Sequence, residues 1–415
     1  MTMKYRANAL RVVSLFCTVG LLLSMFAGCQ ASSRRTANKI TVHLAMTREI
    51  DSVSSTFRNA IEAFNEENDT YTVTPVYYKD EASLQRAVIS GDAIDLIDLF
   101  GLSTDIYVAK GVLLDLYQLL DSDPELSRTD FVPSFLEMAE QNEQLPYLSA
   151  SFAARSLLTP KSVVGDITGW NEEEFIQIAT AAPDEYYIME ETGPLDFLSI
   201  YLTYSIQNYV DVNAGTTNLR HGALCDMLTY CKDGFRTSSQ GDIPLLQYIS
   251  TIFGPTQYVT FLREQAEEYA LVGFPGAEGN GALRYFAAEQ LAISALSEQP
   301  DGAWAFLKYL VSSEDINGIG FPVLQANFDR TIQNAMDDEV DEYGNVIVPG
   351  MTEEERNDLL QWLGDAAGPG GAENTSAVIN IILDEAASYI SGDKSLDDVL
   401  ALMENRLAIY LAEVK

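Results

Sequence analysis

The sequence predicts an α/β fold divided between two lobes, and three observations support this expectation. Strand-like and helix-like patterns alternate after Ile40, which is typical of a parallel sheet with helices on both faces. The chain has 415 residues, a length that favours two lobes or domains over one. Its hydrophobic content of 47% allows full-sized cores. A two-lobed α/β architecture is therefore expected.

The N-terminal segment, residues 1–28, has the pattern of a secretory signal. Basic residues open it, a mostly apolar run follows, and small residues precede Cys29. The apolar run is shorter than the roughly 20 residues that a membrane-spanning helix needs. The end of the segment resembles a bacterial lipoprotein signal, which implies that Cys29 carries the lipid of the mature chain. An uncleaved N-terminal anchor is the alternative. Residues 29–39 are polar and predict a flexible tether.

The charge of the chain limits its partners. It contains 61 acidic and 25 basic residues, a formal net charge of −36, and the signal segment contains none of the acidic ones. Nucleic-acid binding requires basic patches that neutralise phosphates, so nucleic acid is excluded as a partner. The charge suits a soluble domain held outside the cell.

The first lobe is predicted to begin at Ile40. The pattern ITVHLAM is typical of a strand, and Phe57, Ile61 and Phe64 then recur at helical spacing. Gly91 is expected to end a second helix, and AIDLIDLF predicts a buried strand. The expected strands are residues 40–46, 71–78 and 93–100, and the expected helices cover residues 53–64, 84–89 and a segment reaching 107.

The middle of the chain predicts a mostly helical second lobe. Asn171 with Glu174 forms a capping box at the start of a helix. Thr352 with Glu355 forms another capping box. The expected elements are helices at residues 196–209, 223–231, 353–363 and 375–391 and after Ser395, a strand at residues 243–251, and a hairpin turn at residues 341–345.

Residues 268–311 combine a short strand, a glycine-rich loop, a second strand and an amphipathic helix. The loop carries Gly279 and Gly281, and the second strand covers residues 291–296. Pro300 suits a first helical turn, where its missing N–H has no partner to lose. The apolar residues of the helix fall on one buried stripe at i, i+3, i+4, i+7 and i+8.

These patterns together resemble family 1 of the extracellular solute-binding proteins, the receptors of bacterial ABC importers. The resemblance rests on GFP with its glycine-rich loop, on AWAFLKYLV, on DLI followed by a helix and GVLLDL, and on the C-terminal helices. It implies a two-lobed periplasmic-binding-protein-like (type II) fold with a ligand cleft between lobes joined by hinge crossings. Residues 144–158 resemble the family's first crossing. It also implies a first α/β lobe of residues 40–150 plus 288–330 and a helix-rich second lobe of residues 151–287 plus 331–415.

No catalytic or metal-binding pattern stands out in the sequence. His43 lies within a strand pattern and His221 precedes a helix, and neither has zinc ligands at the usual spacing. Cys225 and Cys231 are too far apart on one helix for a disulfide and are expected to be buried thiols. DDEVDEYGN lacks the bidentate Glu of a calcium loop. We therefore expect no enzyme activity, no metal and no cofactor.

The resemblance also implies which residues face the ligand cleft. Arg48 ends the first strand and Phe100 follows the DLI strand; the alternatives are an ion pair of Arg48 with Asp51 or another carboxylate, and a core position for Phe100. Leu99 stands where maltose-binding relatives have a tryptophan. Trp304 and Trp362 are expected in the core, whereas Trp170 is left open. The candidate contacts are Thr47, Arg48, Leu99, Phe100, Ser103, Ser149, Ser151, Phe152, Phe253, Asn374 and Thr375.

The expected function is binding without chemistry. The resemblance implies an extracellular protein, anchored through Cys29 to the outer face of the bacterial cytoplasmic membrane, that acts as a monomer. It would bind a small molecule, most simply a carbohydrate such as an oligosaccharide, and deliver it to an ABC permease. The alternative is a surface lipoprotein of the same fold that acts as a ligand sensor or scaffold without transport.

Overall fold

The computed structural model describes residues 39–102, 104–167, 169–212, 214–237, 243–248, 252–275, 283–287, 289–313, 320–364 and 376–414. The predicted signal segment, Cys29, Ser103, Asn374 and Thr375 lie outside these residues, as do Gly279 and Gly281. Among the described residues, no helix combines the length and the apolar character needed to cross a membrane.

The sheet of the first lobe has the strand order β13-β3-β1-β2. Strand β1 pairs in parallel with β2 and β3, as the alternating pattern predicts, whereas β13 returns from later in the chain and pairs antiparallel with β3. The strands are β1 (Ile40–Met46), β2 (Tyr71–Tyr77), β3 (Leu96–Asp98) and β13 (Leu291–Ile293).

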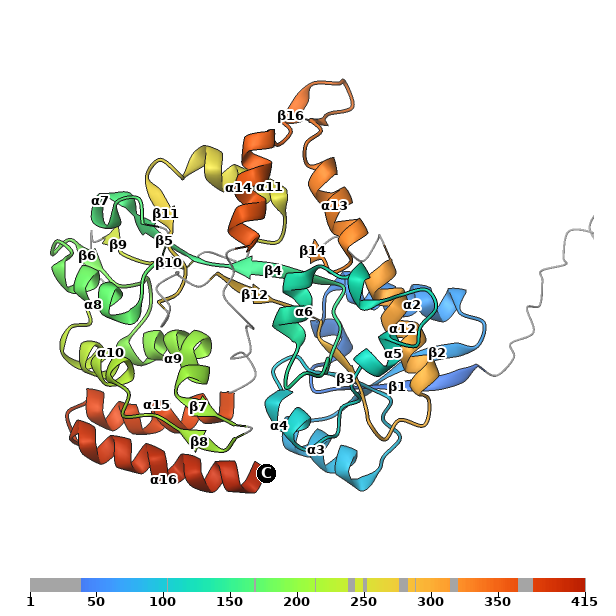
Figure 1. The fold of residues 1–415 in the computed structure, drawn as a ribbon, viewed down its shortest axis with the longest axis horizontal. Helices are drawn as coiled ribbons and strands as arrows, with labels where there is room; N and C mark the ends of the chain where they lie inside the picture. Colours follow the sequence, from blue (N-terminus) through green and yellow to red (C-terminus); the bar gives the residue numbers. More distant parts are fainter. Residues whose placement is uncertain are drawn as a thin grey trace, which may run out of the picture.

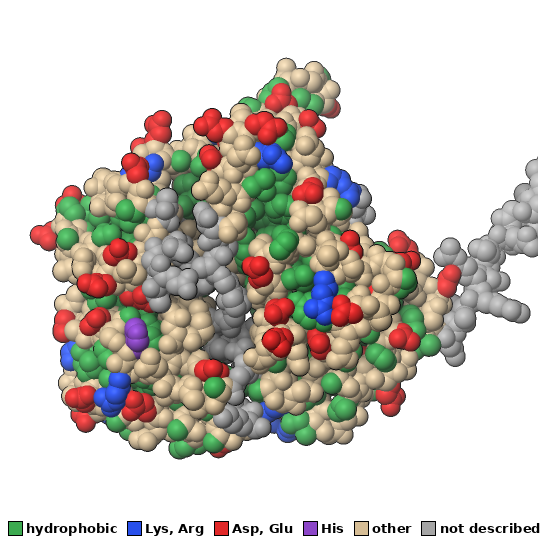
Figure 2. Space-filling model, in the orientation of Figure 1, with side chains coloured by type: hydrophobic (Ala, Val, Ile, Leu, Met, Phe, Trp, Pro, Cys, Tyr) green, Lys and Arg blue, Asp and Glu red, His purple; other side chains and the backbone are tan. Residues whose placement is uncertain are grey.

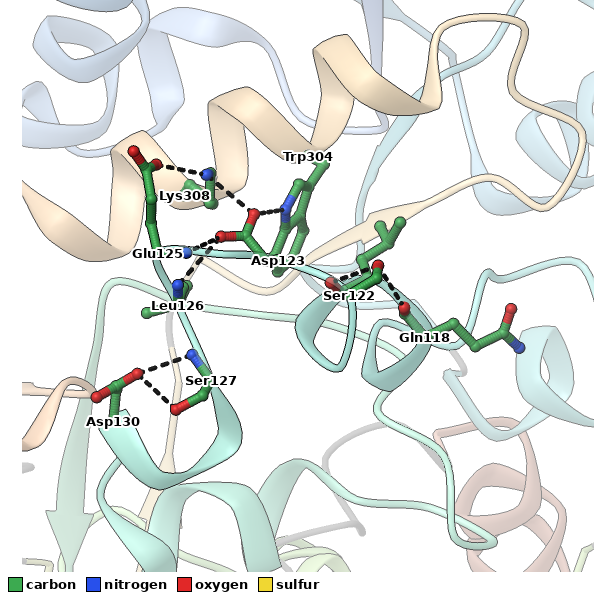
Figure 3. Close-up of polar contacts among 10 residues, drawn as sticks. Gln118, Ser122, Asp123, Glu125, Leu126, Ser127, Asp130, Trp304 and Lys308 are labelled. Carbon is green, nitrogen blue, oxygen red and sulfur yellow. Dashed lines mark hydrogen bonds and ion pairs between the residues drawn. The ribbon is translucent and has the colours of Figure 1, made fainter.

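Helices cover this sheet, and α12 packs closely against it at Gly302. Phe306 of α12 makes an edge contact with Phe64 of α2 at 5.2 Å between ring centroids. Figure 3 shows how Asp123, after α5, holds α12 by accepting hydrogen bonds from Trp304 and Lys308. The helices are η1 (Ile50–Ser52), α2 (Ser55–Glu67), α3 (Glu81–Ser90), α4 (Thr104–Ala109), α5 (Tyr117–Leu120), η2 (Arg128–Asp130), α6 (Pro133–Ala139) and α12 (Pro300–Ser312).

The second lobe is rich in helices, with α15 and α16 side by side at its edge (Figure 1). A small sheet of order β10-β5-β11 completes it. Its helices are α7 (Lys161–Val164), α8 (Glu172–Ala181), α9 (Pro194–Ser205), η3 (Ile206–Asn208), α10 (Gly222–Asp233), α15 (Ser376–Ile390) and α16 (Leu396–Val414). Its strands are β5 (Leu157–Pro160), β6 (Tyr186–Tyr187), β7 (Val210–Asp211), β8 (Thr216–Thr217), β9 (Ile243–Pro244), β10 (Gln247–Tyr248) and β11 (Tyr269–Leu271).

Extended segments connect the two lobes (Figure 1). Strand β4 (Ser151–Arg155) pairs antiparallel with β12 (Arg284–Phe286) and β14 (Phe321–Pro322). Beyond β4, the Ser156 hydroxyl accepts a hydrogen bond from the Gly273 N–H at 3.1 Å, which ties the outgoing and returning segments together. Near this connection lie α11 (Pro255–Glu264), α13 (Gln325–Asn334), α14 (Glu353–Gly364) and the hairpin of β15 (Glu339–Val340) and β16 (Val346–Val348).

Among the described residues, buried hydrophobic side chains form two separate clusters. One contains the β1–β3 sheet, β4 and side chains as far along the chain as Leu363. The other contains Leu157 and the buried side chains of α8, α9, α10, α15 and α16. Ile106 of α4 belongs to this second cluster, so α4 contacts the opposite lobe. The domain limits stated above remain a prediction; buried side chains of α11, α13 and α14 belong to the first cluster.

Most of the local predictions agree with the structure. Both capping boxes form, at Asn171 and at Thr352, and Gly91 ends α3 in the left-handed conformation. Trp170 is buried and donates a hydrogen bond to the Gly273 carbonyl. Cys231 is buried as expected, whereas Cys225 is only half-buried.

The prediction of one strand over residues 243–251 is wrong for the part that the structure describes. Strands β9 and β10 are separate because the chain bends between them, where Leu245 and Leu246 are both buried. The two strands also pair with different partners, β9 in parallel with β6 and β10 antiparallel with β5.

Candidate ligand site

Arg48 and Asp98 form an ion pair where β1 and β3 end. The Arg48 Nε lies 2.6 Å from Asp98 Oδ2, and its Nη2 lies 3.2 Å from Oδ1, so the carboxylate is held by two parallel hydrogen bonds. The Asp98 side chain is only 1% exposed. The partner of Arg48 is therefore the carboxylate at the end of the neighbouring parallel strand rather than Asp51.

Phe100 stands beside this pair with its ring partly open to solvent. The Arg48 guanidinium carbon lies 4.2 Å from the ring centroid, and the residue is 47% exposed. The Phe100 N–H also donates to Asp98 Oδ1 at 3.2 Å. Phe100 is thus not a core residue of its strand, and its position is set by the ion pair beneath it.

Glu289 brings a second carboxylate to the same region from the segment that precedes β13. It accepts a hydrogen bond of 2.9 Å from the Ser54 hydroxyl, which also caps α2 by accepting from the Phe57 N–H. Ser54 and Glu289 line a small hollow together with Ser151 of β4. The charges of Arg48 and Asp98 act on Glu289, so this hollow lies near the ion pair at the ends of β1 and β3.

Burial shapes the electrostatics of both carboxyl groups. It raises the pKa of Asp98 above its ordinary value, although the hydrogen bonds and charge of Arg48 oppose this effect. Burial also raises the pKa of Glu289, against the opposing effects of the Ser54 hydrogen bond and the Arg48 charge. The site thus offers a guanidinium, carboxyl oxygens, hydroxyls and one aromatic face.

Among the described residues, no cluster of histidine, cysteine or carboxylate side chains could hold a metal ion.

Several predicted contact residues have packing roles instead. Leu99 is fully buried in the first core. Phe152 is also buried and packs against an aromatic group that includes Tyr285 and Phe321. The buried Ser149 hydroxyl donates to the backbone carbonyl of Ser151. These three side chains present almost no surface to a ligand, and we no longer propose them as contacts.

The remaining predicted contacts occupy different environments. Ser151 is buried but lines the hollow beside Glu289. Thr47 and Phe253 are half-buried. Ser103, Asn374 and Thr375 lie outside the described residues.

Sequence reasoning missed Asp98 and Glu289. For Asp98 a signal existed, because a carboxylate that ends an otherwise apolar strand requires a partner once it is buried.

Comparison with known proteins identifies the family. Residues 59–318 match the model for a family described as bacterial extracellular solute-binding proteins. This match spans more than half of the chain, so the chain belongs to that family, as its sequence patterns indicate. No curated protein is similar enough in sequence to match the chain.

Solved structures share the two-lobed periplasmic-binding fold. An ABC substrate-binding protein from Listeria monocytogenes in complex with cycloalternan has 13% identity and a TM-score of 0.55, with 90% of this chain and 100% of that chain covered. The sugar-binding protein MalE from Xanthomonas citri has 15% identity and a TM-score of 0.58, with coverage of 90% and 98%. A solute-binding protein from Thermotoga lettingae bound with α-D-tagatose has 13% identity and a TM-score of 0.56, with coverage of 90% and 100%.

Proposed function

We propose that the protein is a lipid-anchored receptor of an ABC importer that binds a carbohydrate, such as an oligosaccharide, between its two lobes. The observation that carries this proposal is the exposed Phe100 ring held beside the Arg48–Asp98 pair at the carboxyl ends of parallel strands. Ligands of open α/β sheets bind at this end of the strands. The ligand is bound and released unchanged, then passed to a membrane permease.

The chemistry of the surface formed by Arg48, Asp98 and Phe100 suits a sugar ring. An aromatic face covers the apolar C–H surface of a pyranose, while planar guanidinium and carboxylate groups exchange hydrogen bonds with its hydroxyls. Phe100 supplies the face, and Arg48 supplies the remaining N–H donors of its guanidinium. Cycloalternan and tagatose, the ligands of two similarly folded proteins, are carbohydrates and thus support the same substrate class.

A ligand panel tests the substrate class. The thermal midpoint of the purified protein should rise with at least one linear or cyclic glucan or simple sugar, because a ligand that binds only the folded state stabilises it. Free amino acids and short peptides serve as the comparison ligands. Stabilisation by peptides alone would contradict a carbohydrate site while leaving a solute-binding role intact.

Attachment of the protein to the membrane through Cys29 is tested separately. We expect Cys29→Ala to abolish incorporation of radiolabelled palmitate and to release the protein or leave its signal uncleaved. Stable attachment requires more than one acyl chain, because a single chain binds a bilayer only marginally. Unchanged lipid labelling of the variant would contradict anchoring at this residue.

A further inference from the structure

A pocket of about 290 Å³ lies apart from the ligand cleft, between α11, α13 and the base of the β15–β16 hairpin. Its volume is at the lower end of the range for specific ligand pockets. The lining combines apolar and polar side chains from these three elements: Pro255, Thr256, Val259, Thr331, Asn334, Ala335, Asp337, Glu339, Val348, Pro349 and Met351.

The wall of this pocket is held rigidly by Arg263. Its guanidinium forms two hydrogen bonds with Glu355, of 2.7 and 2.8 Å, and donates to the backbone carbonyls of Pro349 and Gly350. The side chain of Asp338 accepts from the Gly350 N–H at 2.8 Å. A Cβ at Gly350 would lie 2.2 Å from the Met336 carbonyl oxygen, so the two ends of the hairpin meet in close contact. The pocket is thus preorganised rather than formed by a loose loop.

Several polar side chains of the lining have no protein partner within the described part of the chain, and Asn334, Asp337 and Glu339 are exposed to solvent. Among the described residues, Asp337 and Glu339 form no ion pair, and no hydrogen bond engages the side chains of Thr256, Thr331 or Asn334. Two carboxylates without counter-charges, beside apolar walls, favour a positively charged group on an apolar stem. A lysine or arginine side chain has this chemistry.

The hairpin beside the pocket projects from the body of the protein and exposes apolar side chains (Figures 1 and 2). Tyr343 is 81% exposed and Ile347 is 63% exposed, and Val340 and Val346 are also exposed. Apolar side chains gathered on a projecting element are typical of a surface that a partner covers. A small molecule in the pocket would leave them in water.

We propose that this pocket and hairpin form a docking site for an extended segment of a partner protein, in which a lysine or arginine is flanked by apolar residues. The basic side chain enters the pocket, and its neighbours cover Val346 and Ile347. The carboxylates of the hairpin disfavour a second copy of this chain, because each copy has a net charge of −36, and they disfavour an anionic bilayer. The proposal does not depend on which solute occupies the ligand cleft.

The probe is a fluorescein-labelled Val-Lys-Val-Arg-Val-Lys peptide, and its binding is measured by fluorescence anisotropy. A salt concentration of about 0.15 M limits long-range electrostatic attraction. We expect saturable binding to the purified protein and none for a peptide with Glu at each basic position. Asp337→Asn combined with Glu339→Gln should weaken binding by about tenfold or more. The control, Glu66→Gln with Glu67→Gln, removes the same charge from α2 and should leave the affinity unchanged.

An apolar substitution separates docking from a site for small amines. Ile347→Ser should weaken peptide binding severalfold, whereas Ile409→Ser on α16, where the residue is 62% exposed, should not. Absence of saturable binding would overturn the proposal, as would equal losses in the pocket and α2 variants. An affinity that depends on Asp337 and Glu339 but not on Ile347 would make the pocket a site for small amines and would also overturn it.

Discussion

At the scale of single residues, the candidate ligand site depends on a carboxylate that the ligand need not touch. Asp98 is buried and orients the Arg48 guanidinium, which in turn lies against the Phe100 ring. A free guanidinium would sample many rotamers and lose their entropy on binding. The ion pair avoids this entropy loss on binding, because the guanidinium N–H donors and the Phe100 ring are already in position before the ligand binds.

Substitution of Phe100 and Arg48 should therefore separate affinity from stability. We expect Phe100→Ala to weaken carbohydrate binding by about 1–3 kcal/mol, and to change the free energy of unfolding by less than about 1 kcal/mol because about half of the residue is exposed to solvent. Arg48→Ala should weaken binding similarly, but it should also reduce stability by about 1–3 kcal/mol because Asp98 loses its partner. Calorimetric affinities and urea denaturation of the apo variants measure both quantities. Lost stability with intact affinity in Phe100→Ala would show that the ring has a packing role.

The residues that could be predicted from the sequence are those whose role depends on strand position. Arg48 and Phe100 follow apolar strands, so their place at the sheet edge is readable from the chain. Leu99 and Phe152 could not be separated from them in this way. Neighbouring residues of an extended chain face opposite sides, so a shift of one position decides whether a side chain faces the core or the cleft. The contribution of Glu289 depends on a chain segment that returns almost two hundred residues later, which spacing alone cannot show.

Asp123 gives a second residue-scale prediction, which concerns pH. Burial opposes its ionisation, but hydrogen bonds from Trp304, Lys308 and the Glu125 N–H prevail and lower its pKa from 3.8 to about 2 (Figure 3). A carboxyl with a lowered folded-state pKa stabilises the fold above pH 4, and this contribution is lost as the pH falls from about 4 to about 2. We expect Asp123→Asn to be less stable than the wild type at pH 7, by about 1–3 kcal/mol.

The difference between these two proteins should shrink once the pH falls below about 4, because protonated Asp123 no longer forms its ionic contacts. Urea denaturation at several pH values measures this difference. A difference that stays constant from pH 7 to pH 2.5 would show that the ion contacts do not explain the stability.

At the scale of elements, the first lobe depends on the close approach of α12 to the sheet. Gly302 allows this approach, because a Cβ there would lie 2.5 Å from a ring carbon of Tyr71 and 2.7 Å from a methyl group of Val42. The amphipathic stripe of α12 could be predicted from its spacing, as could the caps at Asn171 and Thr352. The distance between the helix and the sheet could not, since it depends on side chains from β1 and β2.

Gly302→Ala should therefore destabilise the first lobe by about 1–3 kcal/mol, because neighbouring side chains must move to admit one methyl group. Gly222→Ala, at the first residue of α10, is the matched control, since nothing lies within 4 Å of the added Cβ. Thermal or urea unfolding of both variants gives the comparison. Equal stability of the two variants would mean that α12 shifts at little cost.

At the scale of the whole molecule, the two cores and the β4 connection favour movement of the lobes as units. Each lobe has its own buried cluster, while the Ser156–Gly273 hydrogen bond lies where the outgoing and returning segments run together. Segments with few shared core contacts absorb the backbone changes of a hinge more readily than the interior of either core. The α4 contact through Ile106 joins the lobes at a second point, away from the connecting strands.

A ligand that touches both lobes shifts the population toward the arrangement in which both sets of contacts form. We therefore expect the radius of gyration from small-angle X-ray scattering to fall when a verified carbohydrate saturates the protein. Ile106→Ser should reduce this compaction, because it removes an apolar contact between the lobes, while the exposed Ile409→Ser should not. Tight binding without compaction, and without any effect of Ile106→Ser, would mean that the ligand occupies one lobe alone and that closure does not accompany its capture.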